Sequence, residues 1–524
     1  MTQRVFFLTM AVTSLLMAQW GPDVRLTNDP AWSGTAYSNA CCVAATGDTV
    51  HVVWSDYRGG TAGIYYKRSL DRGTTWSADT RLDSSTANAV FPCLVAAGST
   101  LHLAWTDYRN GNSETYYKRS TNAGASWSLD VRLTNDTFPT YTASVAVAGA
   151  YVHVVFGDWR SGNEEVYYKR STDAGATWGP DTRLTNATGY SSYPAVAAGG
   201  NTVHVAWQDT RDGNYEIYYK RSITGGASWF TDVRLTANPT NSASAAIAAA
   251  DSTVHVVWYD DLSGDYELYH KYSTDGGATW GPDLRLTTSP GRSIFHSLAA
   301  VGNEVHLVWE DERDGNQEVY YKRSTDRGLS WSADLRLTTS PDSSALPSIA
   351  FSGGTSHVVW SDRRNGNMEA YYKRGFVSDV GCTRIIAPLG NVDSGQVVTP
   401  RAWVRNFGTV TVSFGVRLSI GSSYTDSVTV SNLAGGDSML LNFPAWTATQ
   451  TGIHIVRCST RLNGDVNPAN DRRVDSVRVV TAPRPFDVGV TRIVAPFGDA
   501  EPGSTVSPTA AWRNFGDTVA SFLA

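Results

Sequence analysis

Charged residues are scarce in this chain, and neither sign of charge predominates. Only 18% of the 524 residues are charged, and the formal net charge is -6. Recognition of nucleic acid requires a basic surface that neutralises phosphates, so the composition argues against a nucleic-acid partner. Cysteine is also rare, because five cysteines in a chain of this length do not make the disulfide framework of a small secreted domain.

Long apolar runs are missing beyond the first residues. Residues 1–18 carry Arg4, then an apolar run and small residues, which is the pattern of a secretory signal peptide cleaved near Ala18. That run is too short for a comfortable membrane span, and no other segment approaches one. The sequence therefore predicts a secreted or cell-surface protein with bacterial-type export and no membrane span after cleavage. We expect it to be a monomer.

Helical periodicity is absent as well, and a repeat of 51 residues takes its place. Each unit contains four short β-branched or aromatic segments separated by Gly, Asn and Asp, which is typical of a four-stranded propeller blade. One histidine marks the second segment of every unit: His51, His102, His153, His204, His255, His306 and His357. Residues at one position of every blade are distant from one another, so we interpret these histidines as structural and not as a zinc site.

The first copy of the fourth segment precedes all the others. Residues 20–27 match residues 178–185 almost throughout, whereas the last unit ends near Gly375 without a fourth segment. Pairing of the opening segment with the last unit would remove two exposed sheet edges. The fold class predicted is therefore all-β, a seven-bladed β-propeller over residues 19–375 closed by an N-terminal strand.

A short motif, Ser-x-Asp-x-Gly-x-Thr/Ser-Trp, joins the third and fourth segments. We expect its Asp and Ser to bond turn amides, its Gly to supply a special backbone conformation and its Trp to pack between strands. Its full copies contribute Asp71, Gly73, Trp76, Asp173, Gly175, Trp178, Asp275, Gly277, Trp280, Asp326, Gly328 and Trp331.

This motif resembles the Asp-box, or BNR repeat, of the sialidase superfamily. The resemblance implies a propeller, but Asp boxes occur in sialidases, other glycoside hydrolases and non-catalytic receptors alike. Sialidases use three arginines on the substrate carboxylate, a Tyr–Glu nucleophile pair and an Asp acid/base, on six blades with an Arg-Ile-Pro motif. This chain has seven units and lacks that motif, so the resemblance assigns no catalytic residue here.

The repeat stops near Phe376. Residues 376–483 contain alternating strands typical of a β-sandwich and resemble a CARDB-type, immunoglobulin-like module. Residues 484–524 repeat its opening, since Asp487-Val-Gly matches Asp379-Val-Gly, and we interpret them as the start of a second, truncated module. Within the first module, a disulfide between Cys382 and Cys458 is possible in an oxidising compartment.

The hairpin between the second and third segments carries most of the charge, in the pattern Trp-x-Asp-x-Arg-x-Gly-Asn-x-Glu. If the turn lies at Ser161-Gly162, Asp158 faces Glu165, and Arg160 could bridge both carboxylates. The pattern could be an anion-binding ring, a pair of catalytic carboxylates or an ion cluster that stabilises each hairpin. We favour the last, because catalysis needs one asymmetric constellation. The arginines are Arg58, Arg109, Arg160, Arg211, Arg313 and Arg364.

Two further features are candidates for binding. One hairpin lacks the arginine and contains four carboxylates, which form either a calcium site or a solvated acidic loop: Asp260, Asp261, Asp265 and Glu267. The connections from the fourth to the first segments carry aromatic residues that either bind a ligand at the channel mouth or fill gaps between blades: Trp32, Tyr37, Phe91, Phe138, Tyr141, Tyr190, Tyr193 and Phe295.

The leading prediction is a non-catalytic propeller that binds a glycan or a surface protein, because the units are nearly identical and their diversity is confined to one set of loops. The alternatives are a sialidase-like glycoside hydrolase and a structural surface spacer. The sequence implies no cofactor other than the possible calcium ion.

Overall fold

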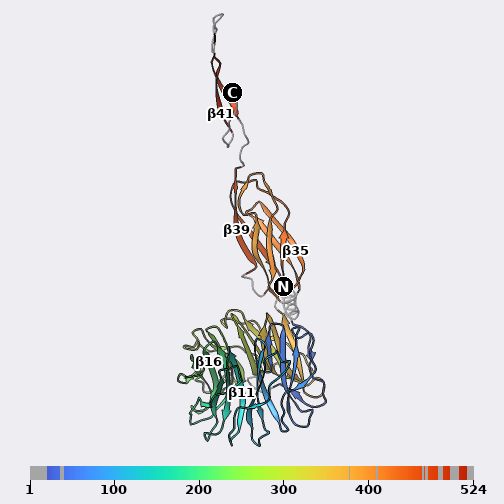
Figure 1. The fold of residues 1–524 in the computed structure, drawn as a ribbon, viewed down its shortest axis with the longest axis vertical. Helices are drawn as coiled ribbons and strands as arrows, with labels where there is room; N and C mark the ends of the chain where they lie inside the picture. The colour runs from blue at the N-terminus through green and yellow to red at the C-terminus, as the bar shows by residue number, and fades with distance from the viewer. Residues whose placement is uncertain are drawn as a thin grey trace, which may run out of the picture. The chain divides into compact units, whose positions relative to one another are not determined.

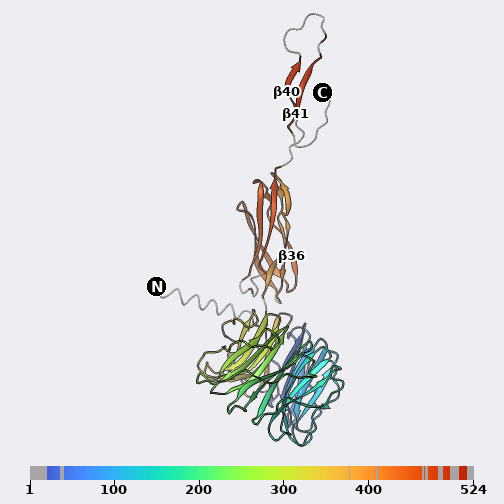
Figure 2. The same cartoon turned by 90° about the vertical axis from the view of Figure 1, so that its left-hand side faces the viewer.

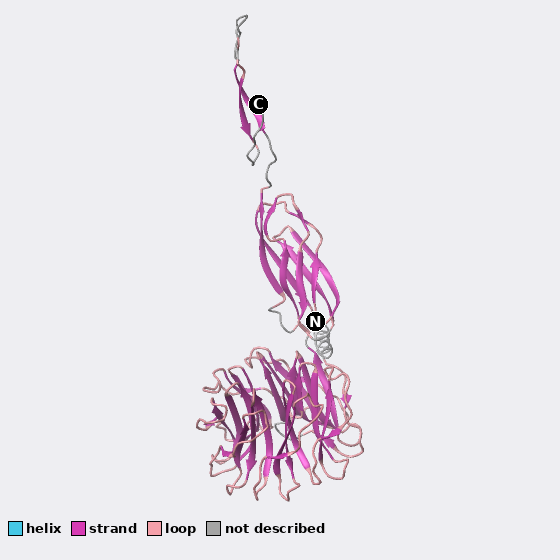
Figure 3. Cartoon of the chain, viewed as in Figure 1, coloured by secondary structure: helices cyan, strands magenta, loops and turns pink. Residues whose placement is uncertain are grey.

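The structure is a computed structural model that describes residues 20–35, 41–376, 378–408, 411–462, 465, 470–481, 488–495, 505 and 507–515. The chain divides into two compact units, Met1–Phe376 and Val377–Ala524. Strands, turns and loops make up all of the described residues, and no helix occurs among them (Figure 3). The all-β class expected from the sequence is therefore confirmed. The predicted signal peptide lies outside the described residues.

The first unit consists of seven antiparallel sheets, one for each sequence repeat, in a propeller-like arrangement (Figures 1 and 2). The first strand of each sheet contacts the first strand of the next sheet, and the first strand of the last sheet contacts that of the first. These first strands are β3 (Val43–Thr46), β7 (Ala89–Ala97), β11 (Thr140–Ala148), β15 (Ser191–Gly199), β19 (Ser242–Ala250), β23 (Ser293–Val301) and β27 (Ser344–Ser352).

The second and third strands form the central hairpin of each sheet. Second strands are buried over nearly their whole length, which explains their continuous Val, Leu and Trp content. They are β4 (Thr49–Asp56), β8 (Thr100–Asp107), β12 (Tyr151–Asp158), β16 (Thr202–Asp209), β20 (Thr253–Asp260), β24 (Glu304–Asp311) and β28 (Thr355–Asp362). The third strands are β5 (Gly63–Ser69), β9 (Glu114–Ser120), β13 (Glu165–Ser171), β17 (Glu216–Ser222), β21 (Glu267–Ser273), β25 (Glu318–Ser324) and β29 (Glu369–Phe376).

The fourth strands are short and include the start of the described chain. Val24 and Arg25 pair with Tyr372 and Tyr371 of β29, in the same register that Thr182 and Arg183 adopt on β13. The predicted pairing between the opening segment and the last sheet is thus present. The fourth strands are β6 (Thr80–Arg81), β10 (Val131–Arg132), β14 (Thr182–Arg183), β18 (Val233–Arg234), β22 (Leu284–Arg285), β26 (Leu335–Arg336) and β1 (Val24–Arg25). An additional strand, β2 (Ser33–Gly34), pairs with the end of β4.

The Asp boxes form the hydrogen bonds expected of them. The Asp173 carboxylate accepts hydrogen bonds from the Thr177 backbone amide at 2.8 Å and from the Thr177 hydroxyl at 2.6 Å. The Ser171 hydroxyl oxygen accepts one from the Gly175 backbone amide at 2.8 Å. The tryptophan, however, packs between sheets and not merely between strands. Trp178 lies edge-on to Tyr117 of the preceding sheet, with ring centroids 4.8 Å apart, and a corresponding contact occurs at Trp20, Trp76, Trp127, Trp229, Trp280 and Trp331.

The second unit has two sheets around one apolar core. One sheet contains β30 (Val380–Ala387), β33 (Arg401–Asn406) and β36 (Ser438–Asn442). The other contains β31 (Gly390–Asp393), β39 (Arg472–Val480), β38 (Gly452–Arg461), β34 (Val412–Ile420) and β35 (Tyr424–Leu433). Both contribute to the core, as Val404 and Val456 illustrate. A smaller pair joins β32 (Val397–Val398) to β37 (Trp446–Thr447).

A second copy of the β30–β33 pair follows further along the chain. Strands β40 (Val488–Ala495) and β41 (Thr509–Asn514) pair antiparallel with the same two register shifts as β30 and β33. The sequence repeat that starts at Asp487 is therefore a structural repeat in the residues that can be compared.

Candidate functional site

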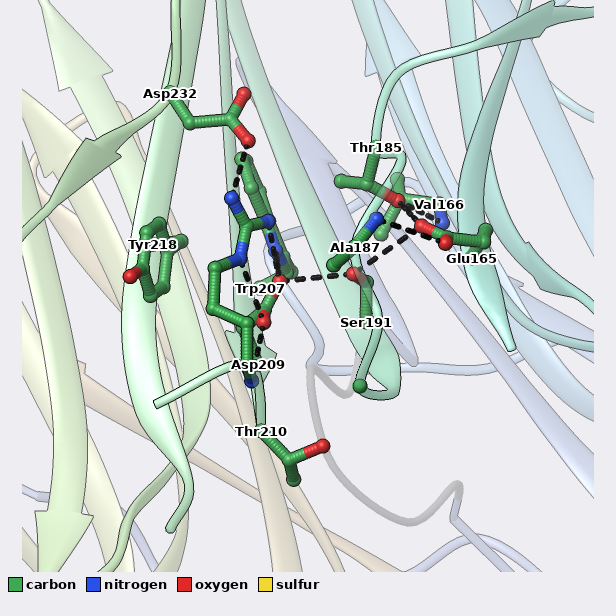
Figure 4. A network of polar contacts seen from close by, with 12 residues as sticks. Glu165, Val166, Thr185, Ala187, Ser191, Trp207, Asp209, Thr210, Tyr218 and Asp232 are labelled. Carbon is green, nitrogen blue, oxygen red and sulfur yellow. Dashed lines mark hydrogen bonds and ion pairs between the residues drawn. The ribbon is translucent and has the colours of Figure 1, made fainter. Parts of the chain in front are cut away.

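The repeated hairpin carboxylates are buried inside the sheets. Asp209 is fully buried, and its carboxylate accepts hydrogen bonds from Trp207 Nε1 at 2.9 Å, Ser191 Oγ at 2.8 Å and the Arg211 guanidinium at 2.6–2.8 Å (Figure 4). Arg211 also donates to Asp232 Oδ2 at 2.9 Å and lies 4.3 Å from the centre of the Tyr218 ring. These bonds favour the ionised carboxylate and lower the pKa of Asp209, against the opposing effect of its burial.

All six hairpin arginines have this environment. Each binds the aspartate two residues before it and a second aspartate at the entrance to a fourth strand, and each lies over a tyrosine ring at 4.3–4.7 Å. Their guanidinium groups are therefore occupied by protein carboxylates and are not an open anion-binding ring: Arg58, Arg109, Arg160, Arg211, Arg313 and Arg364.

The expected bridge between Asp158 and Glu165 is wrong in one respect. The two residues do face each other across the hairpin, but Arg160 turns to Asp181 and not to Glu165. Glu165 is instead bound by Arg183 at 2.8 Å and by the Thr185 hydroxyl, both from the fourth-strand segment. The reason is that six of the seven sheets supply a second arginine, from an Arg-Leu-Thr motif, that sequence spacing alone did not pair with the glutamate.

The sheet without a hairpin arginine does not bring its four carboxylates together. Asp260 is buried and accepts hydrogen bonds from Asn238 Nδ2 at 2.7 Å and Ser242 Oγ at 2.6 Å, whereas Glu267 pairs with Arg285 at 2.8 Å. The Asp261 carboxylate accepts a hydrogen bond from the Asn241 backbone amide, and Asp265 is exposed. In the described residues, no three His, Cys, Asp or Glu side chains are close enough together to hold a metal ion.

The repeated histidines bond to the third strand of their own sheet. His204 Nδ1 lies 2.7 Å from Tyr219 Oη, and the same pair recurs in every sheet except the fifth, where His270 replaces the tyrosine and lies 3.1 Å from His255. Burial lowers the pKa of His204 to about 4, so the ring is neutral at ordinary pH. These histidines hold the sheets together internally.

A β-bulge interrupts the first strand of six sheets. Each bulge shifts the register by one residue against the second strand, as between Ser192 and Ala195. In five of the six bulges, the first residue inside the bulge adopts a positive φ that is unusual for a non-glycine residue and that commonly marks a functional site. These residues are Phe91, Tyr193, Ser244, Phe295 and Leu346, with φ from 48° to 58°.

The bulges border a pocket of about 790 Å³, a volume ordinary for a small-molecule site. Eight aromatic residues from five sheets line it: Phe91, Tyr141, Trp159, Tyr193, Tyr215, Tyr259, Tyr266 and Phe295. The remaining lining residues are small or polar: Glu164, Gln208, Asn241, Ala243 and Ser244. No lysine, arginine or histidine is among the described residues that line it.

Glu164 is the one carboxylate in this lining. An ideal Cβ built on Gly157 would lie 2.4 Å from Glu164 Oε1, so the carboxylate rests over the glycine backbone. Burial raises the pKa of Glu164 to about 7. Glu310, at the position equivalent to Gly157 three sheets later, also has a pKa raised to about 7 by burial, but it accepts hydrogen bonds from the Leu346 amide and Gln317 Nε2.

The structure divides the aromatic residues singled out from sequence. Tyr141, Tyr193 and Phe295 line the pocket together with Phe91, and they lie in first strands and not in the connections where we expected them, because the bulge extends each strand. Trp32, Phe138 and Tyr190 lie outside the lining. Trp32 packs edge-on to Tyr57 at 5.2 Å, Tyr190 contacts Trp159 at 5.5 Å, and Phe138 is exposed. Tyr37 lies outside the described residues.

Sequence reasoning missed Glu164, Trp159, Gln208, Tyr215, Tyr259 and Tyr266. A signal for them exists. Positions 157 and 164 and their equivalents, one repeat apart, vary from unit to unit, whereas the hairpin residues beside them recur. Glu164 immediately precedes the recurring Glu165 and was hidden by it.

In the second unit, the structure brings the two candidate disulfide cysteines together. Cys382 and Cys458 are buried in the core, and their sulfur atoms lie 2.7 Å apart as free thiols. The described residues include no helix that is long and apolar enough to cross a membrane.

Comparison with known proteins identifies no family for this chain. No protein-family model matches it, and no curated protein does. Among solved structures, the polysaccharide lyase Uly1 is 10% identical with a TM-score of 0.48, over 68% of this chain and 99% of the lyase. A mutant Trypanosoma rangeli sialidase that displays trans-sialidase activity is 10% identical with a TM-score of 0.42, over 96% of this chain and 94% of the sialidase. A CARDB domain from Pyrococcus furiosus, solved with di-metal ions, is 25% identical with a TM-score of 0.19, over 20% of this chain and 96% of that domain. At these scores none of the similarities carries a function over to this chain.

Proposed function

We propose that the first unit is a closed seven-bladed propeller that binds a glycan in its aromatic pocket without transforming it. The observation that carries the proposal is the lining itself, eight aromatic rings from five sheets around one cavity. Closure of the ring is supported by the pairing of β1 with β29 and by the contact between β27 and β3.

An aromatic lining suits a sugar because pyranose rings present apolar C–H faces that stack on aromatic rings, while a few polar groups orient the hydroxyls. Gln208, Asn241 and Ser244 are polar lining residues of that kind. A loop of a surface protein is the other occupant that such a pocket admits, and the experiment below distinguishes it. The second unit would display the propeller outside the cell, in keeping with the predicted signal peptide.

Binding is favoured over hydrolysis by what the lining contains. Glycoside hydrolysis ordinarily uses two carboxyl groups flanking the bond to be cleaved, and Glu164 is the single acidic residue among the described lining residues. The sialidase alternative would need arginines on the substrate carboxylate. The hairpin arginines, such as Arg160 and Arg211, are bound to two aspartates each.

The test is a glycan array on the purified full chain, together with a fluorogenic sialoside assay. Tyr193→Ala and Phe295→Ala remove pocket rings, and Leu129→Ala is the control, because Leu129 is 88% exposed and lies outside the pocket. We expect saturable binding that both pocket variants lose and the control keeps. Turnover of the sialoside would overturn the non-catalytic assignment. Silence in both assays, for all proteins, would favour a spacer or a protein-binding role.

A further inference from the structure

The charge of the pocket is one-sided. Glu164 supplies a carboxylate, and the described lining contains no cationic side chain to balance it. Arginines in the surrounding sheets are already neutralised. Arg160 pairs with Asp158 and Asp181, and Arg292 pairs with Glu312 at 2.5 Å. When Glu164 is ionised, no cationic side chain of the described lining therefore balances its negative charge.

Glu164 does not form the structural hydrogen bond that its equivalent in another sheet forms. Its equivalent in the sixth sheet, Gln317, donates to Glu310 at 2.7 Å, whereas no side-chain hydrogen bond joins the Glu164 carboxylate to another described residue. Gly157 makes room for the carboxylate, and the other six sheets have a side chain at that position: Ser55, Thr106, Gln208, Tyr259, Glu310 and Ser361. Only in this sheet is the position a glycine, and the space that the missing side chain leaves is occupied by the Glu164 carboxylate.

The aromatic rings act in the same direction as the carboxylate. The face of an aromatic ring is electronegative and attracts ammonium groups, most strongly where water is excluded. Trp159 and Tyr193 line the cavity together with Glu164, and the Glu164 carboxylate is close enough to Tyr193 to raise the pKa of its hydroxyl further, beyond the effect of burial. Rings and carboxylate together are the elements of a cation-binding cage.

We infer that the pocket selects a ligand that carries an ammonium group, and that the glycan it binds contains an unacetylated amino sugar of the glucosamine type. The inference rests on the proposed glycan-binding function and adds the charge of the ligand to it. The sugar ring stacks on the aromatic residues, and the ammonium donates to the Glu164 carboxylate. The bound ammonium keeps that carboxylate ionised.

The experiment compares three β-1,4-linked tetrasaccharides that differ at carbon 2, namely glucosamine, N-acetylglucosamine and glucose. Calorimetric titration of the full chain is done at a pH where the free amines are protonated. We expect the glucosamine oligomer to bind about tenfold more tightly than the other two, as a cation–π contact with a charge-assisted hydrogen bond implies. Glu164→Gln should reduce its affinity to that of the glucose oligomer.

Asp48→Asn is the matched control. Asp48 lies in the turn between β3 and β4, is 60% exposed and pairs with Arg72, so this variant removes one negative charge without changing the pocket. It should keep the preference for the amine. Equal or weaker binding of the glucosamine oligomer, or a preference that survives in Glu164→Gln, overturns the inference but leaves glycan binding in place. Failure of all three oligomers together with a silent glycan array would remove the proposed function itself.

Discussion

Asn238 donates its side-chain amide to the buried Asp260 carboxylate at 2.7 Å, in the one sheet where Leu262 stands in place of the hairpin arginine. In the fourth sheet the equivalent positions are occupied by Ala187, Asp209 and Arg211, and the Arg211 guanidinium donates to the carboxylate. The chain thus contains two solutions to one problem. A buried carboxylate needs donors, and either a guanidinium or an amide from the preceding connection can supply them.

Removal of Arg211 should lower the unfolding free energy, and an asparagine amide introduced at position 187 should restore part of it. Arg211→Leu leaves Asp209 buried without its cation, and we expect about 3–5 kcal/mol of lost unfolding free energy. Adding Ala187→Asn copies the fifth sheet and should recover about 1–3 kcal/mol, the contribution of a hydrogen bond to a charged group. Denaturant unfolding followed by tryptophan fluorescence measures both. The control is Ala187→Asn alone, which should be close to neutral, and a double variant no more stable than Arg211→Leu would refute the interpretation.

The stability of the first unit should fall as pH rises through the range between the unfolded and folded pKa values of Glu164. Burial raises the pKa of this carboxyl to about 7 from an ordinary 4.5. The native state therefore holds its proton more tightly than the unfolded state, and unfolding free energy declines between about pH 4.5 and 7 and then levels.

Glu164→Gln removes the pH dependence of the unfolding free energy that this carboxyl contributes. The variant should match the parent chain at pH 4 and exceed it at pH 8 by up to about 3 kcal/mol, the value of the pKa shift at about 1.4 kcal/mol per unit. Thermal unfolding across the pH range tests it, with the exposed Asp48→Asn as the comparison. Identical pH profiles for Glu164→Gln and the parent chain would show that the carboxyl is solvated and not desolvated as the structure has it.

The Asp-box glycines are constrained by the neighbouring sheet as well as by their own turn. Gly175 has φ +80°, and an ideal Cβ there would lie 1.9 Å from Tyr117 Oη of the preceding sheet. Gly162 has φ +92° with no atom within 4 Å of such a Cβ. Gly162→Ala should therefore cost about 1–2 kcal/mol for backbone strain, and Gly175→Ala a further 1–3 kcal/mol for the clash. Equal losses of unfolding free energy would mean that Tyr117 moves aside without cost.

Oxidation should join Cys382 and Cys458 in an oxidising compartment. Their sulfurs already lie 2.7 Å apart in the core of the second unit, and the bridge would close a long loop worth about 4 kcal/mol of stability in the chain-entropy model. Peptide mass spectrometry without reductant should find the two cysteines linked. The Cys382→Ser, Cys458→Ser double variant should unfold at the same temperature in reducing and oxidising buffer, unlike the parent chain. Recovery of two free thiols from protein exported into an oxidising medium would contradict this.

Much of the architecture could be read from the chain. The 51-residue period, the Asp-box turns and the match between residues 20–27 and residues 178–185 predicted the number of sheets and the partner of the opening segment, because these depend on local pattern and on its repetition. The facing of Asp158 and Glu165 across their hairpin followed from the turn position in the same way.

The site itself was decided by the tertiary structure. A one-residue bulge changes which side chain faces the cavity. No sequence pattern within a strand predicted the left-handed backbone conformations of Tyr193 and Phe295. The direction of Arg160 depends on Asp181, which follows the third strand and approaches only when the sheet forms. The repeat period and the composition determine the strands and turns of each 51-residue repeat, because these depend on local sequence. Which residues of different units meet around one cavity is a property of their packing, and it placed Glu164 among aromatic rings that lie far from it in the sequence.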